Sequence, residues 1–96
     1  MINPNIILPE KAFRIFRRYF NGARKIEIAE DEVSIYDIRC QYMAGGIMLT
    51  VLDDGIVLHD NEVNQDSTSI SIFEGPLTTR FVKQSCITMK EKYNGR

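Results

Sequence analysis

IMLTVLDDGIVLH, residues 47–59, contains two apolar runs separated by Asp53-Asp54-Gly55. An Asp-Gly pair between two apolar runs is a strong short-range signal of a β-hairpin. The sequence therefore predicts that residues 47–52 pair antiparallel with residues 56–59. Apolar residues occupy successive positions in both runs, so we expect this hairpin at the centre of a sheet that is covered on both sides.

The segment before the hairpin, residues 33–43, alternates between apolar and polar side chains, as in a half-buried strand. A helical reading would place Asp37 and Gln41 within the apolar arc, and the β-branched and aromatic content also favours a strand. The turn Ala44-Gly45-Gly46 joins this strand to the hairpin. The predicted apolar face comprises Tyr36, Ile38, Cys40 and Tyr42.

We expect two outer strands beside these three. Residues 25–29 read as a short strand, and residues 67–73 alternate apolar and serine positions after a polar loop over residues 60–66. Gly75-Pro76 is expected to end the second of these strands. Its predicted buried face comprises Thr68, Ile70 and Ile72.

A helix is predicted at each end of the chain. Pro9 suits the first turn of a helix and Asn21-Gly22 suits its exit, which indicates a helix over residues 9–21. Its aromatic residues form a core face, and Lys11, Arg14, Arg17 and Arg18 form the solvent face. Residues 77–93 form a second predicted helix with some strand character in TTRFVKQSCIT. Its apolar stripe comprises Val82, Cys86, Met89 and Tyr93.

Together these elements predict one α+β domain over residues 1–96, an antiparallel meander of about five strands flanked by an N-terminal and a C-terminal helix. If both helices lie on one face of the sheet, the outer face of the central hairpin stays bare around Met48, Leu52 and Val57. Exposed apolar faces usually mark interfaces. We therefore expect a homodimer through the sheet or a face that binds a partner.

The composition, 44% hydrophobic and 26% charged, is typical of a globular protein. No apolar run approaches the roughly 20 residues that span a bilayer, and residues 1–11 lack the features of a secretory signal, so the cytoplasm is the expected compartment. Cys40 and Cys86 are far apart in apolar patterns and are expected to be buried, reduced thiols.

Charge is unevenly distributed along the chain. Residues 1–25 carry six basic and one acidic side chain, residues 26–66 carry one basic and ten acidic, and residues 67–96 carry five basic and two acidic. These counts give +5, −9 and +3, which sum to the net charge of −1. The predicted helices are thus basic and the predicted meander is acidic.

The acidic meander motivates our first functional hypothesis. Its carboxylates are expected to gather at one end of the sheet and to steer a partner with a basic surface. The protein would then be a small protein-binding module of the inhibitor, immunity or anti-defence type. The expected partner-binding residues are Asp53, Asp54, Asp60, Glu62 and Asp66.

The alternative hypothesis is a nucleic-acid-binding accessory protein whose basic helix faces contact phosphates without reading bases. A sequence pI near 5.8 argues against it. The residues expected to bind nucleic acid are Arg14, Arg17, Arg18, Arg24 and Lys25, which Lys83, Lys90 and Lys92 could join if both helices share one side.

Catalytic and metal-binding signals are weak. His59 is the single histidine and no nucleophile motif accompanies it, so we interpret it as a strand-end residue and expect no enzyme activity. Residues 60–66 resemble a calcium loop but have Gln65 and Ser71 where glycine and glutamate are required. We therefore expect no metal and no cofactor.

Overall fold

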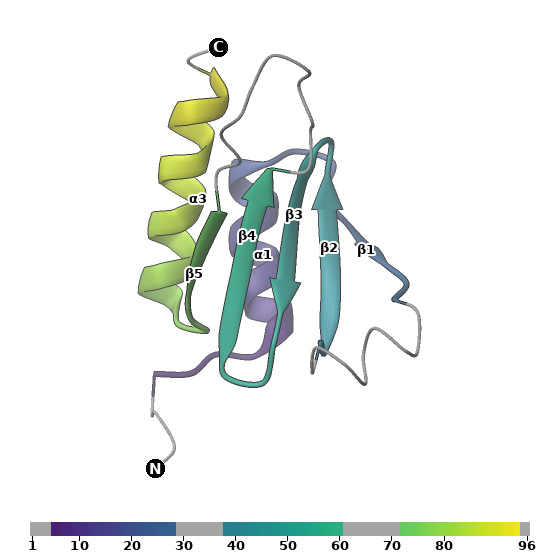
Figure 1. Ribbon diagram of the computed structural model, residues 1–96, viewed down its shortest axis with the longest axis vertical. Coiled ribbons are helices and arrows are strands. Elements are labelled where there is room, and N and C mark those ends of the chain that lie inside the picture. The colour runs from purple at the N-terminus through teal and green to yellow at the C-terminus, as the bar shows by residue number, and fades with distance from the viewer. Residues whose placement is uncertain (1–4, 29–37, 61–71, 95–96) are drawn as a thin grey trace.

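Figure 1 shows the computed structural model of the chain, in which residues 5–28, 38–60 and 72–94 are described. This part of the chain forms two helices and one five-stranded antiparallel sheet, which is the predicted α+β layout. The strands follow one another across the sheet in chain order, as in a meander. The elements are α1 (Pro9–Tyr19), β1 (Arg24–Ile26), β2 (Cys40–Ala44), β3 (Ile47–Val51), β4 (Gly55–Asp60), β5 (Ile72–Pro76) and α3 (Thr79–Asn94).

The hairpin of β3 and β4 forms as predicted. Leu49 pairs with Leu58 and Val51 pairs with Ile56, and all four side chains are at most 1% exposed. In the turn before β3, Gly45 has a φ of +58°, a conformation that glycine adopts without strain. The sequence therefore locates both the hairpin and the turn that precedes it.

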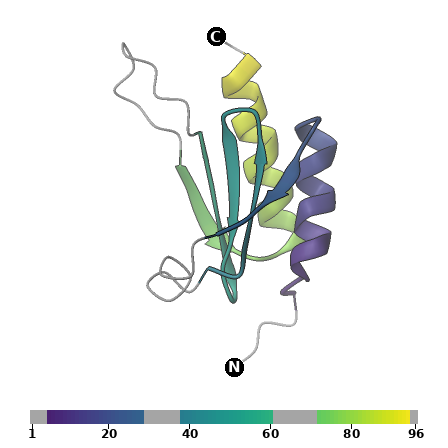
Figure 2. The same cartoon turned by 90° about the vertical axis from the view of Figure 1, so that its right-hand side faces the viewer.

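Both helices pack on the same face of the sheet, as Figure 2 shows. α1 contacts β2, whereas α3 contacts β4 and β5. The side chains beneath the helices form one core. The sheet contributes to it Cys40, Tyr42, Ala44, Ile47, Leu49, Val51, Ile56 and Leu58.

Neither α1 nor α3 packs on the other face of the sheet, which we call the open face. The expected cover by helices on both sides is therefore wrong for the described residues. The physical reason is that α1 and α3 pack against each other, so they share one face of the sheet. The predicted bare face is thus free of helices among the described residues, but Met48, Leu52 and Val57 on it are half-buried. Its residues include Ile26, Gln41, Met43, Met48, Thr50, Val57, His59, Ile72 and Glu74.

The helical patterns are confirmed. In α1, Ala12 and Phe16 are fully buried, and the four basic residues of the predicted solvent face are exposed. In α3, Val82, Cys86 and Met89 are at most 1% exposed. The helical repeat of 3.6 residues per turn thus places apolar and polar residues on opposite faces of both helices.

The last strand differs from its prediction. β5 is an edge strand that continues through Gly75 to Pro76, where a proline is tolerated because an edge strand need not donate on both sides. Ile72, expected to be buried, is 53% exposed on the open face, because it pairs with His59. Phe73 lies on the helix side instead, against the core.

Some expectations lie outside the described residues, namely Tyr36 with the rest of residues 33–37, the loop after Asp60, and the first part of the strand expected over residues 67–73. Cys40 and Cys86 are buried and unpaired, as predicted. In the described parts of the chain, neither helix is both long and apolar enough to cross a membrane.

Candidate functional site: a cationic groove between the helices

α1 and α3 begin at the same end of the sheet because the chain segments before them are paired. Ile6 forms a bridge with Thr78, and the backbone N–H of Ile7 donates to the carbonyl of Leu77 at 2.9 Å. The Thr78 hydroxyl accepts a hydrogen bond from the backbone N–H of Phe81 at 3.2 Å and so caps α3. The two helices therefore run side by side in the same direction (Figure 1).

A groove of about 280 Å³ lies along the contact of the two helices. Four basic residues line it, three from α1 and one from α3, together with two residues that offer apolar surface and one threonine. The lining residues are Lys11, Arg14, Arg18, Lys83, Ile15, Tyr19 and Thr79.

The α1 wall follows from helical geometry. Lys11, Arg14 and Arg18 stand at i, i+3 and i+7, so they form one stripe along the helix. Arg17 points elsewhere, since its guanidinium lies 5.4 Å from the centroid of the Phe13 ring. That ring stacks on Tyr42 of β2 with centroids 4.4 Å apart. Arg17 thus lies exposed over Phe13, while Lys11, Arg14 and Arg18 line the groove.

The α3 wall carries Lys83, and Lys90 lines a neighbouring hollow together with Tyr19. No carboxylate lines the groove among the residues that the structure describes. In the same residues, the ion pair within 4 Å joins Arg39 and Asp53 at 3.9 Å, and neither residue lines the groove. Among the described residues, no carboxylate within 4 Å therefore pairs with a cation of the groove.

The nucleic-acid-binding residues expected from the sequence are divided by the structure. Arg14 and Arg18 meet Lys83 at the groove, whereas Arg24 and Lys25 lie on β1, at the edge of the sheet. Lys92 lies over the ring of Phe73, 5.6 Å from its centroid. Lys11 was not among the expected site residues, although its i, i+3, i+7 relation to Arg14 and Arg18 is visible in the sequence.

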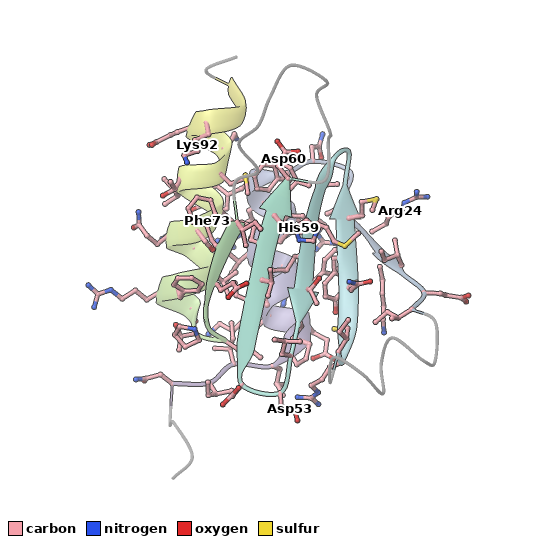
Figure 3. The ribbon with its side chains drawn as sticks, in the orientation of Figure 1. Arg24, Asp53, His59, Asp60, Phe73 and Lys92 are labelled. Atoms are coloured by element: carbon pink, nitrogen blue, oxygen red, sulfur yellow. The ribbon has the colours of Figure 1, made fainter. Side chains whose placement is uncertain are left out.

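The expected acidic cluster is not brought together. Asp53 and Asp54 follow β3 in the hairpin turn, whereas Asp60 ends β4 at the opposite end of the sheet, as Figure 3 shows for Asp53 and Asp60. β4 covers six residues, which corresponds to roughly 17 Å. Asp60 is also 5% exposed on the helix side. Glu62 and Asp66 lie outside the described residues.

The titratable groups of the core are not arranged for nucleophilic catalysis. Cys40 and Cys86 face the helix side, and His59 lies on the open face, so the sheet separates the thiols from the imidazole. Burial raises the pKa of Cys86 to about 12. Burial, followed by a hydrogen bond from Cys40, also raises the pKa of Tyr42. The Cys86 thiol and the Tyr42 hydroxyl are therefore protonated at neutral pH.

No family model matches the chain, and no curated protein or solved structure shows significant similarity to it.

Proposed function

We propose that this protein is a non-catalytic, cytoplasmic protein-binding module that holds an acidic, amphipathic segment of a partner protein in the groove between α1 and α3. The observation that carries the proposal is the groove itself, which has cations on both walls and apolar surface between them. The buried, unpaired thiols support the cytoplasm, where thiols stay reduced.

Electrostatics favours an acidic ligand. Along α1, the three cations are separated by about 4.5 and 6 Å, because the helix rises 1.5 Å per residue. A partner helix with carboxylates at i, i+3 and i+7 repeats that spacing. Because Lys83 extends the positive charge to the second wall, a bound segment would meet cations on both sides.

The apolar part of the groove favours a protein over a nucleic acid. Ile15 and Tyr19 are half-buried, and they offer contact surface to a leucine or phenylalanine of the partner. A phosphate backbone offers no such group, and it would need a larger continuous basic surface than these four cations provide. The net charge of −1 points the same way.

The proposal is tested with a synthetic amphipathic peptide that carries glutamates and leucines at helical spacing. Its affinity for the wild type is measured by fluorescence anisotropy at physiological salt. Arg14→Glu/Arg18→Glu reverses two groove charges, and Arg24→Glu/Lys25→Glu reverses two charges outside the groove. Both variants change the net charge by the same amount, so the second is a matched control.

The groove variant is expected to lose roughly 1 to 3 kcal/mol of binding free energy, about 5- to 150-fold in Kd, while the control stays within about twofold. Equal losses in both variants would show that the overall field binds the peptide and not the groove. Single-stranded and duplex oligonucleotides are measured in parallel. An oligonucleotide that binds more tightly than the peptide, with the same dependence on Arg14 and Arg18, would instead assign the groove to nucleic acid.

A further inference from the structure

The open face carries a row of directly paired residues that crosses all five strands. Arg24 pairs with Met43, Met43 with Met48, Met48 with His59, and His59 with Ile72. Because paired residues of neighbouring strands point to the same side, the five side chains form one line across the open face. Figure 3 shows His59 over the middle of the sheet, on the side turned away from the helices.

The centre of this row places the Met48 thioether between that of Met43 on β2 and the imidazole of His59 on β4. Cβ atoms of directly paired residues lie about 4.5 to 5.5 Å apart. Two ligand atoms on one metal ion lie at a similar separation of about 3.5 to 4.5 Å, since metal–ligand bonds to nitrogen and sulfur are about 2.0 to 2.3 Å long. Met48 stands between Met43 and His59, and methionine is long and flexible enough to close the remaining gap.

We propose that Met43, Met48 and His59 form a binding site for a soft monovalent metal ion of the Cu(I) class. Thioether sulfur is a soft ligand that selects Cu(I), and imidazole also binds copper, whereas magnesium, calcium and manganese prefer oxygen. The site follows from the pairing of the strands. It is independent of the groove between the helices, because it lies on the other side of the sheet.

The surroundings permit this chemistry. All three side chains are half-buried, so an ion can reach them while most of its environment is protein. Arg24 ends the row and disfavours a cation weakly, because its exposed charge is screened by water.

The buried thiols are the main competitors for a soft ion. Cys40 and Cys86 lie on the helix side of the sheet and are at most 5% exposed. The raised pKa of Cys86 keeps its thiol protonated, and the thiolate is the form that binds metals. A test must therefore report which residues bind the ion as well as how tightly it binds.

Ag(I), added as nitrate in chloride-free buffer, is a suitable probe because it is soft, monovalent and stable in air. The protein is labelled with ¹³C at its methionine methyl groups, and one equivalent of Ag(I) is added. The methyl signals of Met43 and Met48 and the ring signals of His59 are expected to shift, while the signal of buried Met89 stays in place. Calorimetry is expected to give one ion per chain.

Met43→Leu/Met48→Leu removes both sulfurs at nearly constant volume, and Met89→Leu is the matched control in the core. The double variant is expected to bind Ag(I) roughly 100-fold more weakly, since even an outer-shell partner is worth about 10- to 100-fold in metal affinity. His59→Gln, tested separately, should weaken binding as well. Absent binding, equal affinities of the double variant and the control, or shifts confined to residues around Cys40 and Cys86 would overturn the proposal.

Discussion

Met48 and Leu49 are neighbours on β3 with side chains of similar size, yet they belong to different environments. Leu49 is fully buried under the helices, whereas Met48 is half-buried on the open face. The same contrast holds along β2 and β4, whereas on β3 the open-face residue Thr50 is 6% exposed and buried like its neighbours. The covered face therefore supplies most of the packing energy, whereas most described side chains of the open face keep partial contact with solvent.

The largest expected effect compares the two faces directly. Leu49→Ala leaves a cavity in the core and should lower the free energy of unfolding by about 2 to 5 kcal/mol. Met48→Ala removes a side chain that already contacts water and should cost no more than about 1 kcal/mol. Urea unfolding followed by circular dichroism measures both. Similar losses would mean that the open face is buried in solution, for example in a homodimer.

A second prediction concerns how tightly α3 packs on the covered face. A Cβ added at Gly75 would lie 2.5 to 2.7 Å from ring atoms of Phe81. Gly75→Ala must therefore displace this ring and is expected to cost about 1 to 3 kcal/mol. The same change in a Phe81→Ala background should cost much less, which a double-mutant cycle reveals. Additive losses would contradict this contact.

The two faces should also differ in how pH affects their contribution to stability: the covered face should lose stability at alkaline pH and the open face at acid pH. Burial raises the pKa of Cys86 from 9.0 to about 12, so its contribution to stability is complete below pH 9. That contribution is lost as the pH rises toward 12, by at most about 1.4 kcal/mol per pH unit. Tyr42, whose pKa is also raised, adds to this loss above pH 10.

His59 on the open face behaves in the reverse way. Its pKa is lowered from 6.5, so its contribution is present above pH 6.5 and is lost as the pH falls below it. Unfolding midpoints from pH 5 to 10.5 test both signs. Cys86→Ala should partly reduce the loss of stability at alkaline pH. His59→Gln should reduce the loss of stability at acid pH. A wild type whose stability does not change between pH 9 and 10.5 would refute the alkaline prediction.

The smallest expected effect separates two kinds of arginine on α1. Arg17 lies over Phe13, and Arg17→Ala should cost about 0.5 to 1 kcal/mol of stability while leaving peptide binding unchanged. Arg14→Ala should instead weaken peptide binding and leave the unfolding midpoint within error. Thermal unfolding and fluorescence anisotropy on both variants decide this. The reverse pattern would place Arg17 in the binding surface.

The elements with local signals were predictable. Pro9 starts the first helix, which ends at Tyr19, two residues before the predicted end at Asn21. Gly45 and Asp54-Gly55 mark the turns, because turn chemistry acts within a few residues. β3 carries apolar residues on both faces. The sequence of the strand therefore does not show which face is covered, because that depends on where the helices pack. Gly75 illustrates another limit. It is an expected strand breaker that instead provides space for Phe81, a contact invisible to local sequence patterns.

The candidate site was predictable in part. Helical periodicity groups Lys11, Arg14 and Arg18, but their meeting with Lys83 depends on the pairing of Ile7 with Leu77, which sets the two helices side by side. Among the described residues of the expected acidic cluster, Asp53 and Asp54 do not meet Asp60, and the length of the strand between them could have shown this. Asp60 follows Asp54 by a full strand, so the two residues lie at opposite ends of the sheet.

The most direct test of the proposed function is an NMR titration of the ¹⁵N-labelled protein with the acidic amphipathic peptide. The comparison of the two sides of the molecule predicts that amide shifts concentrate on α1 and α3 around Arg14, Arg18 and Lys83, with the amides of Met48, Val57 and their open-face neighbours unchanged. Shifts concentrated on the open face, or at Asp53 and Asp54, would contradict the assignment of the groove as the binding site.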